Sequence, residues 1–458
     1  MTPGEGDHWF VPLGGCGEIG MNLNLFGHAG SWLMVDCGIT FERPEGSAAL
    51  RPSIQMPDPR FIASRRQRLA GLVLTHAHED HLGAVPYLWR ELRCPIYATP
   101  FTASVLREKN RSRGDTDITG ALIEVRPGDT HQIGPFSVEW MPITHSTPET
   151  CALGITTPTC RILHTADWKL DTDPVVGAPF REAPFRCFAE RGVDAVICDS
   201  TNALKPGRSP TERAVADGLL ETVAPLQGRV VIACFASNVA RMQSVLRLAH
   251  ATQRRVGLLG RSLHTMFRCA RASHLLDPRL QPIAAEHLGY LPEREVLALA
   301  TGSQGEVGAA LHRLMMDSHP HLSLAAGDTV ILSSTTIPGN EMAVNRLVEG
   351  LTARGISVVQ ADAAPRVLHA SGHPCEDELK DLFTLLSPHL VVPVHGEREH
   401  MVANARIARA AGARLALTGA NGDLFYLSPN PGVRRQAADV GRLEWCEENR
   451  SLIPVTGA

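Results

Sequence analysis

The chain of 458 residues lacks the features that mark membrane, secreted and disulfide-stabilised proteins. No apolar run reaches the ~18–20 residues that a membrane-spanning helix needs, so we expect no membrane span. The N-terminus, MTPGEGDHWF, lacks the basic and then apolar pattern of a signal peptide. The 11 cysteines are scattered without a CxxC pair, which argues against a disulfide framework and a structural zinc finger. A cytoplasmic location fits these absences best.

An excess of positive charge is also absent, because 44 Lys and Arg face 48 Asp and Glu, for a net charge of −4. This balance gives no global attraction to nucleic acid, although a local basic groove remains compatible with it. The basic clusters at 65–68 and 107–113 are each more typical of a solvated surface than of a binding site. With 44% hydrophobic residues, the chain is long enough for two or three domains with sizeable cores.

The first 200 residues consist mainly of short apolar runs that end in a polar, potentially reactive residue. These predicted strands lie at 32–38, 69–76, 94–100, 136–145, 160–168 and 193–200. Several strands that deliver Asp or His at their carboxyl ends are how a layered α/β protein assembles a site along one edge of its sheets. One helix is expected directly after His81.

Helical and strand patterns alternate in the second region of the chain, which predicts βαβ units and a parallel sheet. We therefore predict one domain at 1–203 that continues at 366–440, and an α/β domain at 204–365 inserted into it. Residues 441–458 are expected to form a short C-terminal tail.

The segment LTHAHEDH carries the strongest chemical signal in the sequence, an H-x-H-x-D-H cluster at residues 76–81. This spacing cannot put all four side chains on one face of a regular helix or strand, but it suits a loop at a strand end folded around two metal ions. We expect His76 and His78 on one ion and Asp80 and His81 on the other. Zinc and manganese both accept imidazole and carboxylate ligands. Two such ions about 3.5–4 Å apart can share a water and lower its pKa.

Two isolated residues at predicted strand ends, His145 and Asp167, fit as further ligands, because a two-metal site needs a third histidine and a bridging carboxylate. Asp36 is a candidate for holding a ligand histidine or the loop by hydrogen bonds. We interpret His164 as structural.

The HAHEDH segment, with Asp36 before it and His145 and Asp167 after it, resembles the metallo-β-lactamase superfamily. Later motifs resemble, in order and spacing, the β-CASP nucleases, and most closely the bacterial ribonuclease J family. They are CDSTNA (198–203), CFASNVARMQ (234–243), LGRS (259–262), ATGSQGE (300–306), SSTTIPGNE (333–341), HASGHPCEDELK (369–380) and VPVHGEREH (392–400), with GGCGEIGMN (14–22) at the start. The resemblance implies an αββα sandwich with an inserted β-CASP domain of parallel sheet flanked by helices.

The resemblance also implies roles for particular residues. His76, His78 and His145 would hold one divalent ion, Asp80, His81 and His395 the other, with Asp167 bridging; zinc is favoured and manganese is the alternative. Asp199 would support the site electrostatically, and His373 would contact the scissile phosphate and protonate the leaving oxygen. Implied contacts with RNA phosphates and the terminal nucleotide are Ser237, Asn238, Ser303, Gln304, Ser333, Ser334, His369, Ser371 and Gly372. Small residues and backbone N–H groups in these segments allow close approach to phosphate.

The implied activity is that of a metal-dependent ribonuclease, a 5′-to-3′ exonuclease that prefers single-stranded RNA with a 5′-monophosphate and has endonuclease activity as a second mode. A homodimer through the β-CASP domain is expected from the family. The chain departs from the family pattern at Met21, where Lys is more frequent, and in having no long basic N-terminal extension. We also expect the family's additional C-terminal domain, with the assembly contacts it provides, to be missing.

Three other functions remain open from the sequence. A DNA nuclease of the same superfamily would need the same ligands. A small-molecule hydrolase acting on a thioester or lactone is disfavoured by the large inserted domain. A catalytically silent RNA-binding subunit is disfavoured because every ligand position holds a competent residue.

Overall fold

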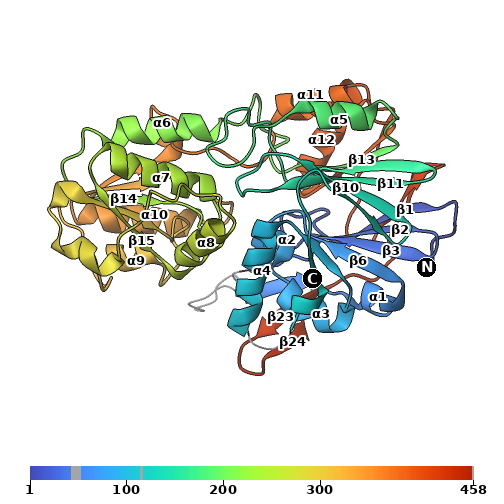
Figure 1. The fold of residues 1–458 in the computed structure, drawn as a ribbon, viewed down its shortest axis with the longest axis horizontal. Coiled ribbons are helices and arrows are strands. Elements are labelled where there is room, and N and C mark those ends of the chain that lie inside the picture. The colour runs from blue at the N-terminus through green and yellow to red at the C-terminus, as the bar shows by residue number, and fades with distance from the viewer. Residues whose placement is uncertain (43–52, 114–116, 456–458) are drawn as a thin grey trace.

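The computed structural model describes residues 1–42, 53–113 and 117–455. Figure 1 shows two units side by side, a larger one built on two facing sheets and a smaller one built on a single sheet. The chain leaves the larger unit after β13 (Ala195–Asp199) and re-enters it before α11 (Glu376–Leu386). The junction between the two units is therefore crossed twice by the chain.

The larger unit holds an eight-stranded sheet in the order β22-β21-β1-β2-β3-β6-β7-β8 and a seven-stranded sheet in the order β20-β19-β13-β12-β11-β10-β9. The first comprises β1 (His8–Gly14), β2 (Leu23–His28), β3 (Ser31–Val35), β6 (Leu69–Val73), β7 (Ile96–Ala98), β8 (Leu122–Glu124), β21 (Leu424–Ser428) and β22 (Gly432–Arg434). The second adds β9 (Thr130–Ile133), β10 (Phe136–Pro142), β11 (Cys151–Thr157), β12 (Cys160–His164), β19 (Leu390–Val394) and β20 (Leu415–Ala416) to β13. Buried side chains from both sheets, such as Phe26 and Trp140, form one core between them.

Helices cover the outer face of each sheet (Figure 1). On one side lie α1 (Arg60–Ala63), α3 (Val85–Leu92) and α4 (Pro100–Arg113), and on the other α5 (Glu182–Ala189), α11 and α12 (Arg398–Ala410). Apolar residues of these helices, such as Leu88 and Leu382, pack against the outward-facing side chains of the strands. This is the αββα sandwich that the resemblance implies, and it is confirmed.

The smaller unit holds a five-stranded sheet in the order β15-β16-β14-β17-β18. All neighbouring strands in it are parallel, as the alternation of helices and strands predicts. Its strands are β14 (Val230–Ala233), β15 (Arg255–Leu259), β16 (Val296–Ala300), β17 (Thr329–Leu332) and β18 (Ser357–Gln360). Its helices are α6 (Glu212–Val223), α7 (Val239–Ala251), α8 (Arg261–Ala272), α9 (Ala310–Met315) and α10 (Glu341–Ala353). The polar loops expected to meet substrate follow β14, β16 and β17, so they share the carboxyl edge of this sheet.

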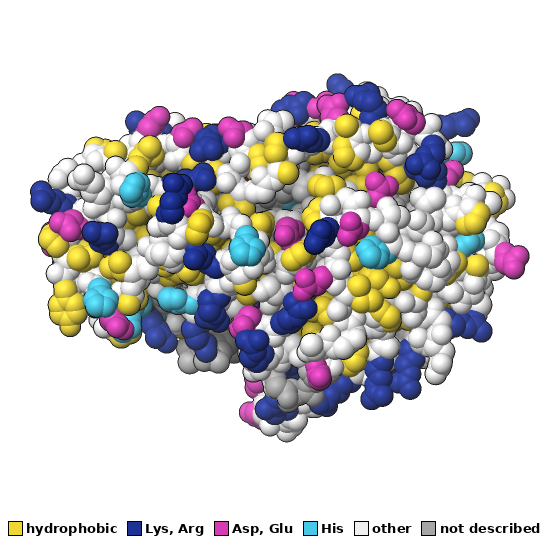
Figure 2. Space-filling view, in the orientation of Figure 1, with side chains coloured by type: hydrophobic (Ala, Val, Ile, Leu, Met, Phe, Trp, Pro, Cys, Tyr) yellow, Lys and Arg dark blue, Asp and Glu magenta, His cyan; other side chains and the backbone are white. Residues whose placement is uncertain are grey.

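The two units also touch away from the chain crossings, where α4 packs against α8. Arg268 of α8 donates to Glu108 of α4 at 3.4 Å, and Arg111 also pairs with Glu108. Figure 2 shows Lys and Arg side chains gathered around the junction together with acidic ones, so charges of both signs border it. Arg107 and Lys109 also form ion pairs, with Glu124 and Glu79, so much of the basic cluster at 107–113 is engaged in ion pairs on the surface.

The segment after residue 440, which the sequence suggests to be a tail, forms regular structure. β23 (Arg442–Cys446) and β24 (Ser451–Pro454) make a small sheet with β5 (Ser53–Pro57) and β4 (Thr40–Glu42), in the order β24-β23-β5-β4. The guanidinium of Arg113 lies 3.6 Å from the ring centroid of Tyr87 and 4.1 Å from that of Trp445. These contacts fasten the segment to the larger unit. Among the described residues, no helix is long and apolar enough to cross a membrane.

Candidate metal centre

The H-x-H-x-D-H segment lies in a loop that backbone hydrogen bonds hold in place. The chain leaves β6 at Val73 and passes through His76 and His78 into a single helical turn, α2 (Glu79–Leu82). Asn22 N donates to the Asp80 carbonyl at 2.8 Å. A Cβ on Gly38 would lie 1.7 Å from that same carbonyl oxygen, so only glycine allows this close approach. The loop is therefore fixed by backbone hydrogen bonding and close packing.

Four buried or half-buried side chains form a first group of potential ligands, namely His76, His78, His145 and Asp167. His78 Nδ1 lies 3.1 Å from His76 Nε2 and 3.0 Å from His145 Nε2. The Asp167 carboxylate oxygen Oδ2 lies 3.9 Å from His76 Nε2 and 3.8 Å from His145 Nε2. Three ring nitrogens thus converge on one point beside a carboxylate.

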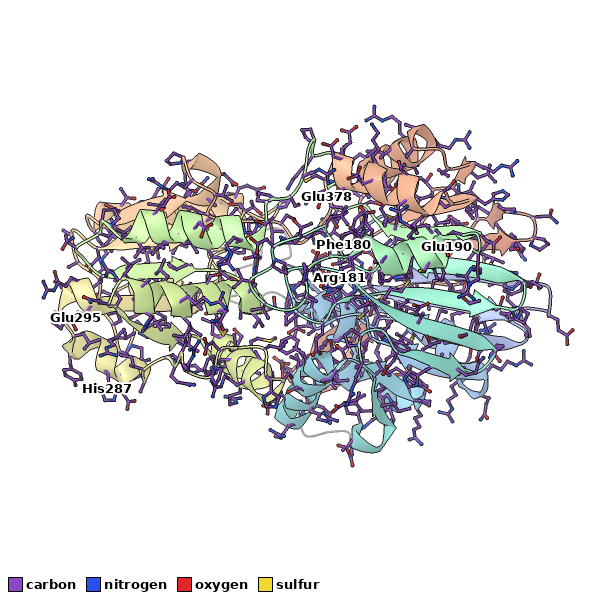
Figure 3. All side chains as sticks on the ribbon, turned by 45° about the horizontal axis from the view of Figure 1, so that its top comes forward. Phe180, Arg181, Glu190, His287, Glu295 and Glu378 are labelled. Atoms are coloured by element: carbon purple, nitrogen blue, oxygen red, sulfur yellow. The ribbon has the colours of Figure 1, made fainter. Side chains whose placement is uncertain are left out.

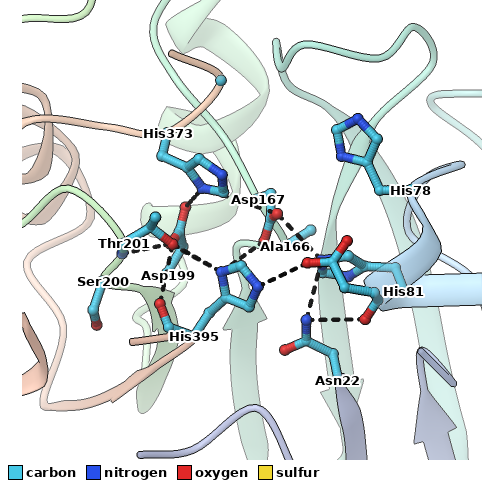
Figure 4. Close-up of polar contacts among 12 residues, drawn as sticks. Asn22, His78, His81, Ala166, Asp167, Asp199, Ser200, Thr201, His373 and His395 are labelled. Atoms are coloured by element: carbon cyan, nitrogen blue, oxygen red, sulfur yellow. Dashed lines mark hydrogen bonds and ion pairs between the residues drawn. The ribbon is translucent and has the colours of Figure 1, made fainter. Parts of the chain in front are cut away.

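A second group shares Asp167 with the first and adds Asp80, His81 and His395. Asp167 Oδ2 lies 3.2 Å from His81 Nε2, and Asp80 Oδ2 lies 3.1 Å from His395 Nε2 (Figure 4). His395 follows the end of β19, 315 residues from Asp80 in the chain. The structure therefore brings all seven predicted ligands together, with Asp167 between the two groups.

The chemistry of this donor set fits two divalent cations. Burial lowers the pKa of His76 and of His145 well below the usual value, and lowers that of His78 to about 4. Neutral imidazoles facing one another offer lone pairs that they cannot mutually satisfy, but that a cation can.

In the second group, burial alone would lower the pKa of His395, but the carboxylates of Asp167, Asp199 and Asp80 outweigh it and raise the pKa to about 10. The same balance raises the pKa of His81, since Asp167 and Asp80 outweigh its burial. These carboxylates thus call for compensating positive charge, which metal ions supply.

Two ligand histidines, His76 and His81, are anchored through their Nδ1 nitrogens. Asp36 accepts from His81 Nδ1 at 2.7 Å and from the Thr75 hydroxyl at 2.9 Å. That hydroxyl also lies 3.0 Å from His76 Nδ1, so Asp36 holds two ligand rings. Such partners fix the tautomer and orientation of a ligand ring.

Asp199 repeats this arrangement on the other side of the centre. Its Oδ1 accepts from the Thr201 hydroxyl at 2.7 Å, and that hydroxyl lies 2.8 Å from His395 Nδ1 (Figure 4). Its Oδ2 lies 2.8 Å from His373 Nδ1. Sequence reasoning missed Thr75 and Thr201, although each stands one or two residues from a singled-out Asp or His in the motifs.

The Gly372 carbonyl anchors the ring of His145, and the closeness of that ring makes glycine necessary at position 372. His145 Nδ1 donates to it at 2.7 Å, and a Cβ on Gly372 would lie 2.6 Å from the His145 ring.

We predict that Gly372→Ala displaces His145 and weakens zinc binding about tenfold to a hundredfold, measured by chelator competition. Gly120→Ala, where a Cβ would meet open space, is the matched control. Equal zinc affinity in both variants would show that the anchor is unimportant.

The polar residues predicted to contact RNA lie in two settings. Ser371, Gly372 and His373 lie beside the metal centre, where Asn202 Nδ2 donates to Ser371 Oγ at 2.8 Å. The others lie at or near the carboxyl edge of the smaller sheet, and most are buried: Asn238, Ser303, Gln304, Ser333 and Ser334, with Ser237 and His369 partly exposed.

Several of these buried side chains are occupied in holding loops. Gln304 Nε2 donates to Thr335 O at 2.9 Å, and its Oε1 accepts from Ile337 N at 2.8 Å. The Asn238 side chain caps α7 by accepting from Arg241 N at 2.8 Å. In this structure these side chains shape the edge of the sheet instead of projecting from it.

Three family models match successive parts of the chain. "Metallo-beta-lactamase superfamily" matches residues 21–184, "Ribonuclease J, beta-CASP domain" matches 227–351, and "Zn-dependent metallo-hydrolase RNA specificity domain" matches 356–415. A crystal structure of a protein of unknown function from Enterococcus faecalis V583 has a TM-score of 0.63 at 18% identity, covering 92% of this chain and 100% of that one. That likeness supports the fold.

Curated relatives share much higher identity. The Ribonuclease J of Sinorhizobium meliloti is 42% identical over 441 residues, which cover 95% of this chain and 77% of that protein. The Ribonuclease J of Mycobacterium tuberculosis is 40% identical, covering 87% and 71%, and that of Thermus thermophilus is 36% identical, covering 93% and 75%. With this similarity along nearly its whole length and a His/Asp cluster fit for two cations, the chain belongs to the ribonuclease J family of metal-dependent nucleases, in the β-CASP group of the metallo-β-lactamase superfamily.

Proposed function

We propose that this nuclease is a 5′-to-3′ exoribonuclease that prefers a 5′-monophosphate and also cuts internally. The observation that carries the proposal is the position of the seven-ligand centre at the junction of the two units, next to the loop that carries Ser371, Gly372 and His373. The names of the relatives, all called Ribonuclease J, support RNA as the substrate. RNA would lie between the units with its scissile phosphate over the centre.

The residues of the centre divide the chemical work. Two divalent cations, zinc by preference and manganese as the alternative, would supply an acidified water and neutralise charge on the phosphate. Asp167 would bridge them, because its carboxylate belongs to both ligand groups. His373 would donate a proton to the leaving 3′-oxygen. Asp199 would orient the ring of His373 and favour its protonated form through the 2.8 Å contact between its carboxylate and Nδ1.

The loops at the edge of the smaller sheet would hold the RNA backbone and its 5′ end. Backbone N–H groups in these Gly- and Ser-rich segments suit phosphate, so sequence preference should be weak. We assign the partly exposed Ser237, His369 and Ser371 to direct contact, and the buried Asn238, Gln304 and Ser333 to support. A homodimer through the smaller unit and a cytoplasmic location complete the proposal.

DNA hydrolysis is the main rival, since the metal centre itself does not read the sugar. A small-molecule hydrolase and a silent RNA-binding subunit are weaker, because the family matching 356–415 is described as an RNA specificity domain and all seven ligands converge.

One experiment separates these functions. End-labelled RNAs carrying a 5′-monophosphate or a 5′-triphosphate, and a DNA of the same sequence, are incubated with the protein in zinc or in manganese, and the products are resolved by length. We expect mononucleotides from the monophosphorylated RNA, slower decay of the triphosphate, and little loss of DNA. DNA degraded as fast as RNA, or no cleavage with either metal, would refute the proposal.

A further inference from the structure

The loop at 368–373, which we call the substrate loop, is fastened at both ends. At one end the Ser333 hydroxyl donates to the Leu368 carbonyl at 2.6 Å. At the other end the Gly372 carbonyl accepts from His145 Nδ1 at 2.7 Å. His369, Ser371 and His373 lie along this loop or at its end, so the two fastenings set where their side chains stand relative to the metal centre.

Arg241 of α7 controls the fastening at Leu368. Its guanidinium donates through Nη1 to the Ser333 carbonyl at 2.8 Å, to the Ser333 hydroxyl, and to the Leu368 carbonyl at 3.4 Å. The other side of the guanidinium faces Glu212, with Nη2 to Oε1 at 3.2 Å and Nε to Oε2 at 3.3 Å. Arg241 therefore joins the end of β17 and the start of the substrate loop to the first residue of α6.

This ion pair is out of contact with solvent. Arg241 is 0% exposed and Glu212 2% exposed. A buried ion pair seldom adds net stability over an apolar pair of the same size, because desolvating both charges offsets their attraction. The fixed, planar geometry of the guanidinium, by contrast, suits it to holding several acceptors in set positions. The pair is therefore better explained by positioning than by stability.

The contacts continue from Glu212 back to the metal centre. Glu212 N donates to Asp171 Oδ2 at 2.9 Å, and Lys169 Nζ lies 3.0 Å from the same oxygen. Lys169 stands two residues after Asp167, and its carbonyl accepts from the hydroxyl of Thr144, the residue before His145, at 2.6 Å. Lys169 and Asp171 are 1% and 2% exposed. The path thus returns to His145 and closes a ring of contacts.

A second carboxylate, that of Glu378, stabilises this closed path of contacts where the chain crosses between the units. Glu378 of α11 accepts from Leu170 N at 2.9 Å and from Ser209 N at 2.9 Å. Figure 3 shows Glu378 beside the connecting segments that lead from the larger unit to the smaller. Both chain segments next to the ring are therefore fixed to the helix that follows the substrate loop.

We propose that Arg241, held by Glu212, is a positioning residue that sets the substrate loop against the metal centre. It acts through Ser333 and Leu368 and does not touch RNA. This inference rests on the proposed function in one respect, namely that the substrate loop binds RNA. It assigns the buried ion pair a role in RNA affinity. Metal binding should be unaffected, because the Gly372 carbonyl at the other end of the loop keeps its own hydrogen bond to His145.

The chain offers a matched control in Arg254. This arginine is 5% exposed and donates to the carbonyls of Gly228 and Val296 at 2.9 Å each, and of Leu226 at 2.5 Å. It lies at the amino edge of the same sheet, because Arg255 begins β15, whereas Arg241 serves the carboxyl edge. Replacing either arginine by methionine removes a buried guanidinium that holds backbone carbonyls, but only one of them holds the substrate loop.

The test compares Arg241→Met, Arg241→Lys and Arg254→Met with the unmodified chain, each loaded with zinc. We expect Arg241→Met to raise KM for a 5′-monophosphorylated RNA about tenfold to a hundredfold, since a misplacement near 1 Å has effects of this size. Zinc content should stay unchanged. Arg254→Met should lower Tm to a similar degree and leave KM within about twofold. Arg241→Lys keeps the charge without the planar fork, so it should show a partial rise in KM, and it serves in place of Arg241→Met if that variant does not fold.

Hydrogen–deuterium exchange of the same proteins gives a readout that needs no RNA. We expect faster exchange at 366–375 in the Arg241 variants, and faster exchange near 226–229 in Arg254→Met. The inference is overturned if the Arg241 and Arg254 variants change KM equally, or if exchange at 366–375 is the same in both. If the unmodified chain does not cleave RNA, the proposed function fails by itself, and the exchange data still decide whether Arg241 holds the substrate loop.

Discussion

Asp80→Ala is expected to abolish RNA hydrolysis, lowering kcat/KM by at least about three orders of magnitude. The Asp80 carboxylate lies 3.1 Å from His395 Nε2 and 3.6 Å from His81 Nε2, so its loss removes one negative charge and one ligand from the second group. His76→Ala should act as strongly through the first group. The bound zinc should fall from about two ions per chain toward one, measured by elemental analysis after gel filtration.

The neighbouring residue supplies the control. Glu79 is next in sequence to Asp80 and carries the same charge, but its carboxylate pairs with Lys109 on α4 and lies outside the two ligand groups that contain Asp80 and His76. Glu79→Gln should keep two zinc ions and change kcat/KM by about twofold or less, as is usual for a surface ion pair. Full activity of Asp80→Ala on monophosphorylated RNA would refute the two-metal mechanism.

The metal centre was predictable from the sequence to the extent that its residues are local. Four ligands fall within residues 76–81, and His145 and Asp167 stand at the ends of recognisable strands. His395 was different, because nothing in its local pattern connects it to a loop 315 residues away. Its place came from the family resemblance, and the structure puts its ring 3.1 Å from Asp80.

The fold was predictable from apolar runs where strands are continuously buried, as in β14, β16 and β17 of the parallel sheet. The terminal strands β23 and β24 were missed for two reasons. Their residues are mostly only half-buried. In addition, β23 forms by pairing with β5, nearly 400 residues earlier, as in the pairing of Arg442 with Pro57, and β24 pairs with β23. A strand stabilised mainly by such distant pairing leaves little trace in its own sequence.

The buried polar network could not be foreseen either. Arg241 reads in sequence as one more charged residue on an amphipathic helix, and charged residues are rarely fully buried unless paired. Its partners Glu212 and Ser333 lie 29 and 92 residues away. The side chains of Ser333 and Gln304 also hold other loops, a role that their motifs do not reveal. Their contact with RNA stays a prediction.

His373 is expected to control the rate at which the leaving oxygen departs. Burial alone would lower its pKa, but the carboxylates of Asp199 and Asp167 outweigh that effect and raise the pKa above its usual value. His373→Asn should lower kcat about a hundredfold to ten-thousandfold, the range for loss of a general acid, with zinc content unchanged. An RNA with sulfur in place of the leaving 3′-oxygen tests the role directly, because a thiolate with a pKa near ~8.5 needs no proton to depart. On that substrate His373→Asn should lose most of its defect.

Asp199→Asn is expected to change the pH dependence of the same proton-transfer step. A general acid must be protonated, so activity falls as pH rises through the pKa of His373, and a raised pKa extends activity to higher pH. Removing the Asp199 carboxylate, 2.8 Å from Nδ1, lowers that pKa, so the fall in kcat should begin at lower pH than in the unmodified chain. The pH profile of Asp199→Asn in zinc measures this shift, and His373→Asn should lose the alkaline limb altogether. If all three proteins share one alkaline limb, a group other than His373 donates the proton.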